Sequence, residues 1–108
     1  MIASHSEYYD RATAAVSRRD YLSAMQYGLR AAGAPRDQAA LRCDAQMLLA
    51  IISLELGDEE AALAYAVGAH LGACRLGDSD RTQRAEAIVT MVLAQCPHLV
   101  ENSATHLH

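Results

Sequence analysis

The chain has 108 residues, of which 52% are hydrophobic and 5% aromatic, and its formal net charge at pH 7 is −4. A chain this short forms one domain, and it is too apolar and too weakly charged to be intrinsically disordered. Alanine and leucine, the strongest helix formers, supply 22 and 13 residues against nine for valine and isoleucine together, so we expect an all-helical fold and no β-sandwich or barrel.

The first part of the chain carries signals for two short helices. Ser4 and Glu7 have the spacing of a capping box, in which the serine accepts a hydrogen bond from a first-turn amide and the glutamate reaches back. They predict a helix over about residues 5–17. A polar run follows, and Asp20 at its end can cap a second helix that continues to about Ala32.

The third predicted helix, over about residues 36–56, is the most apolar. It follows Gly33, which can end the helix before it, and Pro35, which stands where a new helix can start. Its apolar residues recur every three or four positions, which is the spacing of a buried stripe. They are Leu41, Ala45, Leu48, Leu49, Ile52 and Leu56.

Two Leu-Gly-Asp triplets, at residues 56–58 and 76–78, separate the remaining elements. In the first, the glycine fits the left-handed conformation that follows a helix, and in both the aspartate fits the N-cap of the next helix. The triplets predict helices over about residues 59–76 and 80–96, the second of which ends at a proline. Five helices with short links predict an antiparallel array, and residues 1–97 are interpreted as one domain.

The chain aligns with itself at an offset of 38 residues. Asp20 aligns with Asp58, and the helices on either side align at small residues. The aligned pairs are Ala12 with Ala50, Ala24 with Ala62, Gly28 with Ala66 and Ala31 with Ala69. Each unit is therefore a helical hairpin that cannot bury its own apolar face and needs a neighbour. Small residues at these spacings let the helix axes approach closely.

These hairpins resemble the tetratricopeptide repeat (TPR) family, whose unit is a helical hairpin of 34 residues. The unit 43–76 has this length and matches the family at the pair Leu49-Ala50, the turn Gly57-Asp58 and the small residues Ala62 and Ala69. The unit 5–38 is a weaker match, similar at Tyr8, Ala12, Ala24 and Ala31. The resemblance covers about residues 5–95 and implies two TPR-like hairpins followed by a C-terminal capping helix.

Four positions depart from the family pattern. Arg19 replaces the turn glycine, and Gln46 stands at a usually aromatic position. Ala66 occupies a place where a large side chain is common, and Cys74 replaces the closing proline. The small residues and the second turn therefore carry most of the resemblance.

The resemblance implies a concave groove lined by the first helix of each unit. Carried over position by position, it assigns to this groove Tyr9, Thr13 and Val16, then Asp44, Met47, Ile51, Leu54 and Glu55, and finally Thr82, Ala85, Val89 and Val92. These residues are mostly apolar, which suits a peptide or an amphipathic helix of a protein partner. They lack the Lys, Arg and Asn clamp with which some TPR modules hold a C-terminal carboxylate. The alternative is that Met47, Ile51 and Leu54 are core residues beneath the fifth helix.

No catalytic motif is visible in the chain. The glycines are scattered, and all nine basic residues are arginine, which excludes enzymes that depend on a lysine. We expect no enzyme activity, no cofactor and, without a basic cluster interleaved with aromatic residues, no nucleic-acid partner. His70 and Cys74 share a helix face but are only two ligands, and the tail over residues 98–108, predicted to be flexible, adds His98, His106 and His108.

Features of the chain point to a cytoplasmic location. The N-terminus has no signal-peptide pattern, and apolar runs such as residues 47–52 are too short to span a membrane. The three cysteines match neither a disulfide framework nor a zinc pattern. Abundant alanine and absent lysine indicate a GC-rich bacterial genome.

The resulting hypothesis is a non-enzymatic protein-binding module, by analogy with small bacterial chaperones or adaptors of the secretion type. Its partner would be another protein or a second copy of the chain. Two alternatives stay open at this point. The chain could be a sensory or scaffolding segment of a larger signalling protein, or a small metal-binding protein that uses His70 with Cys74 or the tail histidines.

Overall fold

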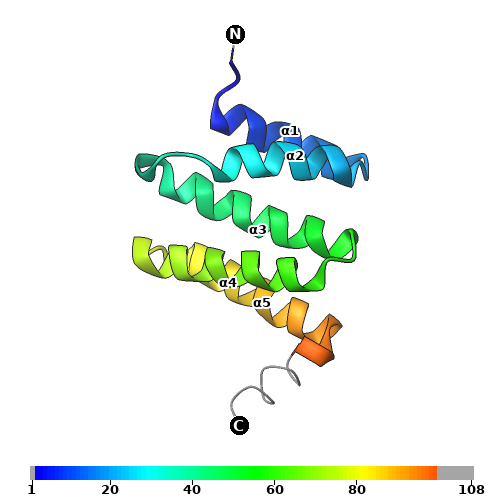
Figure 1. Cartoon of the computed structure of the whole chain (residues 1–108). Coiled ribbons are helices and arrows are strands. Elements are labelled where there is room, and N and C mark those ends of the chain that lie inside the picture. The colour runs from blue at the N-terminus through cyan, green and yellow to red at the C-terminus, as the bar shows by residue number, and fades with distance from the viewer. Residues whose placement is uncertain (1, 100–108) are drawn as a thin grey trace.

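The computed structural model describes residues 2–99, and over this range the chain is all-helical with no strand (Figure 1). The elements in chain order are α1 (His5–Ser17), α2 (Tyr21–Ala32), the 3-10 helix η1 (Arg36–Gln38), α3 (Ala39–Glu55), α4 (Glu59–Leu76) and α5 (Ser79–Gln95). The all-helical prediction is confirmed.

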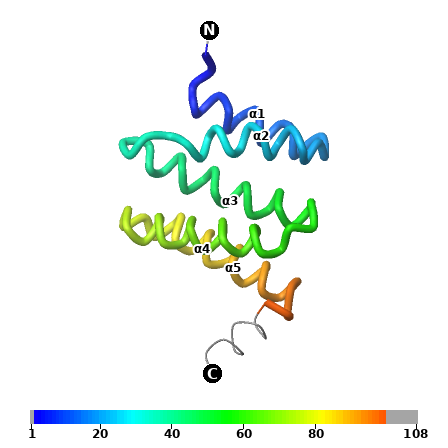
Figure 2. The backbone as a smooth tube through the Cα atoms, in the orientation of Figure 1, coloured from blue at the N-terminus to red at the C-terminus, as the bar shows by residue number. Residues whose placement is uncertain are grey.

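Each long helix packs against the next one along the chain. Figures 1 and 2 show α3 in the middle of the molecule, with α1 and α2 on one side of it and α4 and α5 on the other. Helix α3 also touches α1 and α5. Over residues 2–99 it is therefore the only one of the five long helices in contact with the other four, which explains why its sequence is so apolar.

Three helix-to-helix turns share one pattern of hydrogen bonds. Asp20, Asp58 and Asp78 are the N-caps of α2, α4 and α5, and each carboxylate accepts from the backbone N–H three residues later, at 3.3, 3.2 and 3.0 Å respectively. The N–H of each aspartate donates to the carbonyl five residues earlier, at 2.9, 2.8 and 3.2 Å. These caps satisfy amides that the helix itself leaves unpaired, and they confirm the predicted helix starts.

The residue before each capping aspartate has a positive φ. Gly57 and Gly77 adopt φ values of 81° and 66°, which glycine reaches without strain. Arg19 occupies the same place in the first turn with a φ of 60°. The same backbone turn is thus built from glycine twice and, at a conformational cost, from arginine once.

The beginning of the third helix differs from the prediction. Residues 36–38 form η1, and the α-helix starts only at Ala39. The N–H of Gln38 donates to the carbonyl of Pro35 at 2.9 Å, and Gln38 itself has a ψ of 37°, outside the α-helical range. Pro35 therefore starts a tight turn ahead of the helix.

Small residues bring the helices close together. Ala24, Ala31, Ala62, Ala66 and Ala69 are all fully buried. At Gly28 an added Cβ would lie 2.9 Å from the Cδ2 atom of Leu49, so the side chain of Leu49 occupies the place that a larger residue in α2 would need. This arrangement lets a large side chain of α3 pack directly on the backbone of α2.

The packed part of the chain continues past α5. Residues 97–99 form a helical turn, and Leu99 is buried in a cluster with Ala50, Ala62 and Val92. His98 Nε2 lies 2.7 Å from Glu59 Oε2. The first two residues of the predicted tail thus lie against the helices, and the rest of that tail, from residue 100 onward, is outside the described residues.

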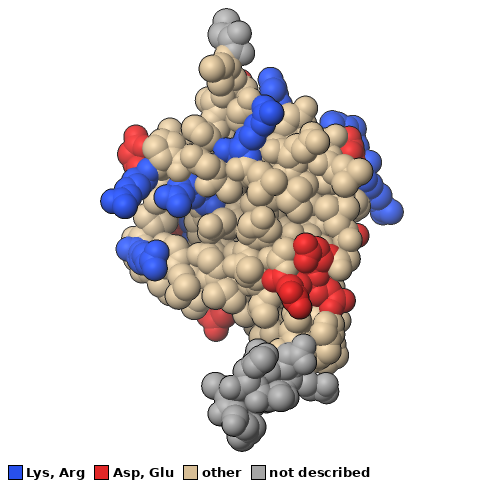
Figure 3. Space-filling model, viewed as in Figure 1, with Lys and Arg blue, Asp and Glu red and all other residues tan. Residues whose placement is uncertain are grey.

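Acidic and basic side chains gather at different ends of α3 and α4 on the face seen in Figure 1. Figure 3 shows a cluster of acidic side chains over the turn between α3 and α4, and basic side chains at the opposite end of these two helices. Glu55, Asp58, Glu59 and Glu60 surround that turn in the sequence. The two ends of the α3–α4 pair therefore carry opposite charge.

Candidate functional site

Two hollows on one side of the molecule together form the candidate site. The first, of about 350 Å³, is lined by Tyr9, Asp44, Met47, Leu48, Ile51, Arg84, Ala87 and Ile88. The second, of about 380 Å³, is lined by Ile51, Leu54, Glu55, Met91 and Gln95. Ile51 lines both hollows, so they adjoin each other between α3 and α5, with α1 at the end of the first. We call the two together the central groove.

The structure brings together most of the residues that were assigned to a groove on the first and third helices. Those in the central groove are Tyr9, Asp44, Met47, Ile51, Leu54 and Glu55. Thr13 and Val16 lie outside it. The Thr13 hydroxyl donates to the carbonyl of Tyr9 at 3.0 Å on the exposed side of α1, and Val16 packs against a buried cluster with Ala15 and Ile52.

The alternative that the apolar residues of α3 are core holds for one of them. Met47 is only 6% exposed and packs with Cys43, Ala69 and Ala85. Ile51 and Leu54 are half-buried and face the groove. The groove floor is therefore made of side chains that already pack on one side and are open to solvent on the other.

On α5 the structure corrects the predicted residues. Ala85 and Val92 are fully buried, and Val89 is half-buried against the cluster that contains Val92. Thr82 turns its hydroxyl to the carbonyl of Asp78, at 2.8 Å. The groove is lined instead by Arg84, Ala87, Ile88, Met91 and Gln95.

These five α5 residues form one stripe, since they recur at three or four positions. Sequence reasoning missed them because α5 is apolar nearly all round between Ala85 and Ala94. A helix of this kind offers two candidate stripes, and periodicity alone cannot tell which of them is covered. Arg84 and Gln95, at the two ends of the stripe, were the polar signals that could have indicated its register.

One of the two acidic residues of the groove, Asp44, is paired with arginines of the chain. Asp44 receives two hydrogen bonds from Arg81, Nε to Oδ1 at 2.9 Å and Nη2 to Oδ2 at 2.8 Å. Arg81 also donates through Nη1 to Asp78 Oδ2 at 2.7 Å, and Arg84 Nη2 lies 3.9 Å from Asp44 Oδ1. Hydrogen bonds to Arg81 hold the pKa of Asp78 below its ordinary value, and both carboxylates raise the pKa of Arg81. This network fixes α5 to α3 and leaves Asp44 with little charge to offer a ligand.

Tyr9 in the groove and Cys43, which lies outside it on α3, both have a raised pKa. Burial, and then the nearby carboxylate of Asp44, raise the pKa of Tyr9 above its usual 10.0, so its hydroxyl stays protonated. The thiol of Cys43 donates to the carbonyl of Ala69 at 3.2 Å, and burial raises its pKa. Both groups therefore act as neutral packing residues.

The part of the chain that the structure describes holds no metal cluster. No three His, Cys, Asp or Glu side chains over residues 2–99 lie close enough together to share an ion. His70 Nε2 and Cys74 Sγ are 3.9 Å apart and form a pair only. His106 and His108 lie outside the described residues.

Comparisons with known proteins add no further assignment. No protein-family model, curated protein or solved structure matches the chain. Within residues 2–99, none of the helices combines the length and the apolar character that crossing a membrane requires. The groove must therefore be interpreted from its own lining and charges.

Proposed function

We propose that the chain is a non-enzymatic protein-binding module that holds an amphipathic helix of a partner protein in the central groove. The observation that carries this proposal is that the two hollows adjoin at Ile51. Together they present apolar side chains flanked by polar ones, which suits an amphipathic helix with apolar residues at every third or fourth position.

The lining of the groove supports a helical peptide rather than a small molecule. Ile51, Leu54, Ile88 and Met91 supply the apolar floor, and the thioether of Met91 can adapt to different side chains. Glu55 lies at one end and forms no ion pair among the described residues, whereas Asp44 at the other end is bonded to Arg81. A bound helix would therefore place a basic residue near Glu55.

The architecture is consistent with a TPR-like array, which is part of the same proposal. The helices pack in chain order as hairpins, and α1, α3 and α5, the first helices of successive units, all line the groove. Buried alanines stand at the small positions of the second helices. A small chaperone or adaptor of the secretion type is the kind of protein that would use such a module.

Selection from a peptide library on the purified protein tests this function. We expect enriched sequences with apolar residues at helical spacing and a basic residue at one end. Ile51→Glu places a charge on the groove floor and should weaken binding of the selected peptides by at least about tenfold, because a carboxylate would lose its hydration there. Met47 is unsuitable for this test because it belongs to the core.

A matched control variant is available on the outside of the molecule. Leu71 is 50% exposed on α4 and lines none of the groove, so Leu71→Glu makes a similar change elsewhere. Peptides should bind Leu71→Glu as they bind the unchanged protein. If the selected peptides bound Ile51→Glu as tightly as Leu71→Glu, with both variants folded, the central groove would not be the binding site.

A further inference from the structure

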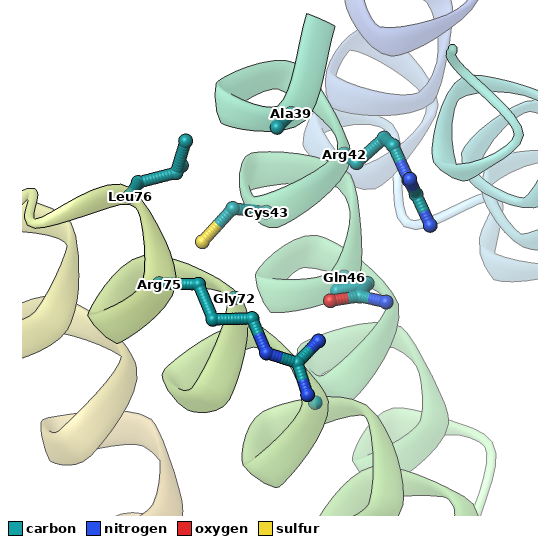
Figure 4. A pocket seen from close by; sticks show the side chains of 8 residues that line it. Ala39, Arg42, Cys43, Gln46, Gly72, Arg75 and Leu76 are labelled. Carbon is teal, nitrogen blue, oxygen red and sulfur yellow. The ribbon is translucent and has the colours of Figure 1, made fainter. Parts of the chain in front are cut away.

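A third hollow lies between the start of α3 and the end of α4, shown in Figure 4. Its volume is about 230 Å³, and it is lined by Ala39, Arg42, Cys43, Gln46, Gly68, Gly72, Arg75 and Leu76. Gln46 on its wall is two residues after Asp44, which lines the central groove. Two residues correspond to a rotation of about 200° around an α-helix. The hollow therefore opens on the opposite side of α3 from the central groove, and we call it the arginine pocket.

The charged groups of the arginine pocket are hydrogen-bond donors, and the Gln46 amide can both donate and accept. Arg42 comes from α3 and Arg75 from α4, and Figure 4 shows the side chain of Arg75 extending towards Gln46. Among residues 2–99 neither guanidinium forms an ion pair, and no acidic residue lines the pocket. The Cys43 thiol is already bonded to Ala69. The pocket thus presents two positive charges and an amide to whatever enters it.

Two glycines in the middle of α4 open the pocket. A glycine inside a helix costs about 1 kcal/mol relative to alanine, so its presence needs a reason. A Cβ added at Gly72 would meet no atom within 4 Å, and one at Gly68 would make only ordinary contact with Gln46, at 3.6 Å. Packing within the chain therefore does not require either glycine, and their missing side chains leave space in the α4 wall of the pocket.

We propose that the arginine pocket binds a small oxyanion, the phosphate or carboxylate group of a small molecule, between Arg42 and Arg75. The planar guanidinium matches both groups, because its N–H donors can bond two oxygens at once. The N-terminus of α3 and the C-terminus of α4 meet at this end, so their opposed dipoles largely cancel and the arginines supply the attraction. The basic side chains that Figure 3 shows at this end add to it. This site does not depend on the function proposed for the central groove.

Calorimetric titration with inorganic phosphate and, separately, with succinate tests the proposal and distinguishes the two anion types. At low ionic strength we expect saturable binding of one equivalent of at least one probe, weakened by added salt. Arg42→Gln and Arg75→Gln should each reduce the affinity by about tenfold, since each removes charge-assisted hydrogen bonds to the anion.

Two further variants separate the pocket from the general charge of this end. Gly72→Leu should fill the pocket and abolish binding while the thermal unfolding temperature stays equal or rises, because leucine is a better helix former and its Cβ would meet no atom within 4 Å. Arg36→Gln removes the same charge from η1 at the same end but outside the pocket, and it should leave the affinity nearly unchanged.

Two results would overturn the site. One is the absence of saturable binding for both probes. The other is an equal loss of affinity in Arg36→Gln and Arg75→Gln, which would show that anions respond to the overall charge and not to the pocket. Arg42→Gln keeps the test decisive if a change in α4 disturbs folding, because it alters only α3.

Discussion

The hairpins α1–α2 and α3–α4 share a turn and a set of small residues but differ in what surrounds them. At the offset of 38 residues, Arg11 of the first hairpin corresponds to Leu49 of the second. Arg11 is exposed, whereas Leu49 is fully buried against Gly28. The hairpin α3–α4, packed between α2 and α5, buries a large apolar residue at this place, and α1–α2, which has described helices on one side only, does not.

The outer side of the first hairpin is closed by aromatic rings and arginines. Tyr8 and Tyr27 stack with their centroids 6.3 Å apart, and the guanidinium of Arg11 lies 5.7 Å from the centroid of Tyr8. Arg30 lies 5.2 Å from the same ring and donates to the Tyr8 hydroxyl at 3.0 Å. These amphipathic side chains cover the end of the array while keeping their polar tips in water.

The largest expected difference is between truncating Leu49 and truncating Arg11, which stand at corresponding places of the two hairpins. Leu49→Ala removes a buried side chain and leaves a cavity over Gly28, so we expect a loss of about 3 kcal/mol in the free energy of unfolding. Arg11→Ala removes only exposed cation–π contacts and should cost less than about 1 kcal/mol. Urea denaturation measures both, and equal losses would contradict the distinction between inner and end units.

The next effect concerns the capping aspartates. Asp78→Ala removes both the cap of α5 and the ion pair with Arg81, whereas Asp20→Ala removes a cap alone. Thermal unfolding should therefore show a larger fall in Tm for Asp78→Ala. A larger fall for Asp20→Ala would show that the network around Arg81 contributes little to stability.

The same aspartates predict a pH dependence. Hydrogen bonds hold the pKa of Asp78 and of Asp20 below the ordinary 3.8, so their stabilising effect is complete above that value and is lost as the pH falls through the lowered pKa. Urea denaturation at pH 7 and in strong acid measures how far the free energy of unfolding falls on acidification. This fall should be smaller for Asp78→Ala than for the unchanged protein. An unaltered pH dependence would contradict the role given to this carboxylate.

A smaller effect should follow from exchanging the turn residues. Gly57→Arg puts a side chain at a φ of 81° with no clash, so the cost of about 1 kcal/mol is backbone strain alone. Arg19→Gly relieves that strain in the first turn, although the added freedom of glycine in the unfolded chain offsets part of the gain. Denaturant unfolding should show a loss of stability for Gly57→Arg and a gain for Arg19→Gly. A loss for both variants would mean that Arg19 has a stabilising contact of its own.

The smallest effect is expected at Ser53, which corresponds to Ala15 of the first hairpin. Its hydroxyl is fully buried and has no hydrogen-bond partner among the described residues. Ser53→Ala makes the second hairpin like the first and should raise the free energy of unfolding by up to about 1 kcal/mol. A loss of stability on denaturation would show that the hydroxyl is satisfied in solution.

The sequence predicted those features of the fold that depend on local chemistry. Asp20, Asp58 and Gly57 marked the ends of helices because caps and left-handed residues act within a single turn. The start of α3 was missed, since proline at a helix start does not distinguish a 3-10 turn from an α-helix. The register of α5 was also missed, because the choice between Ala85 and Arg84 depends on which neighbour covers the helix.

The buried position of Leu99 matters for anyone who alters the length of the chain. A version that stops at Gln95 would retain all five long helices and still uncover the cluster around Val92, because Cys96 and Leu99 both belong to it. It would also remove the contact between His98 and Glu59. Labels or fusion partners should therefore be attached beyond Leu99 or beside Ile2, which is 93% exposed.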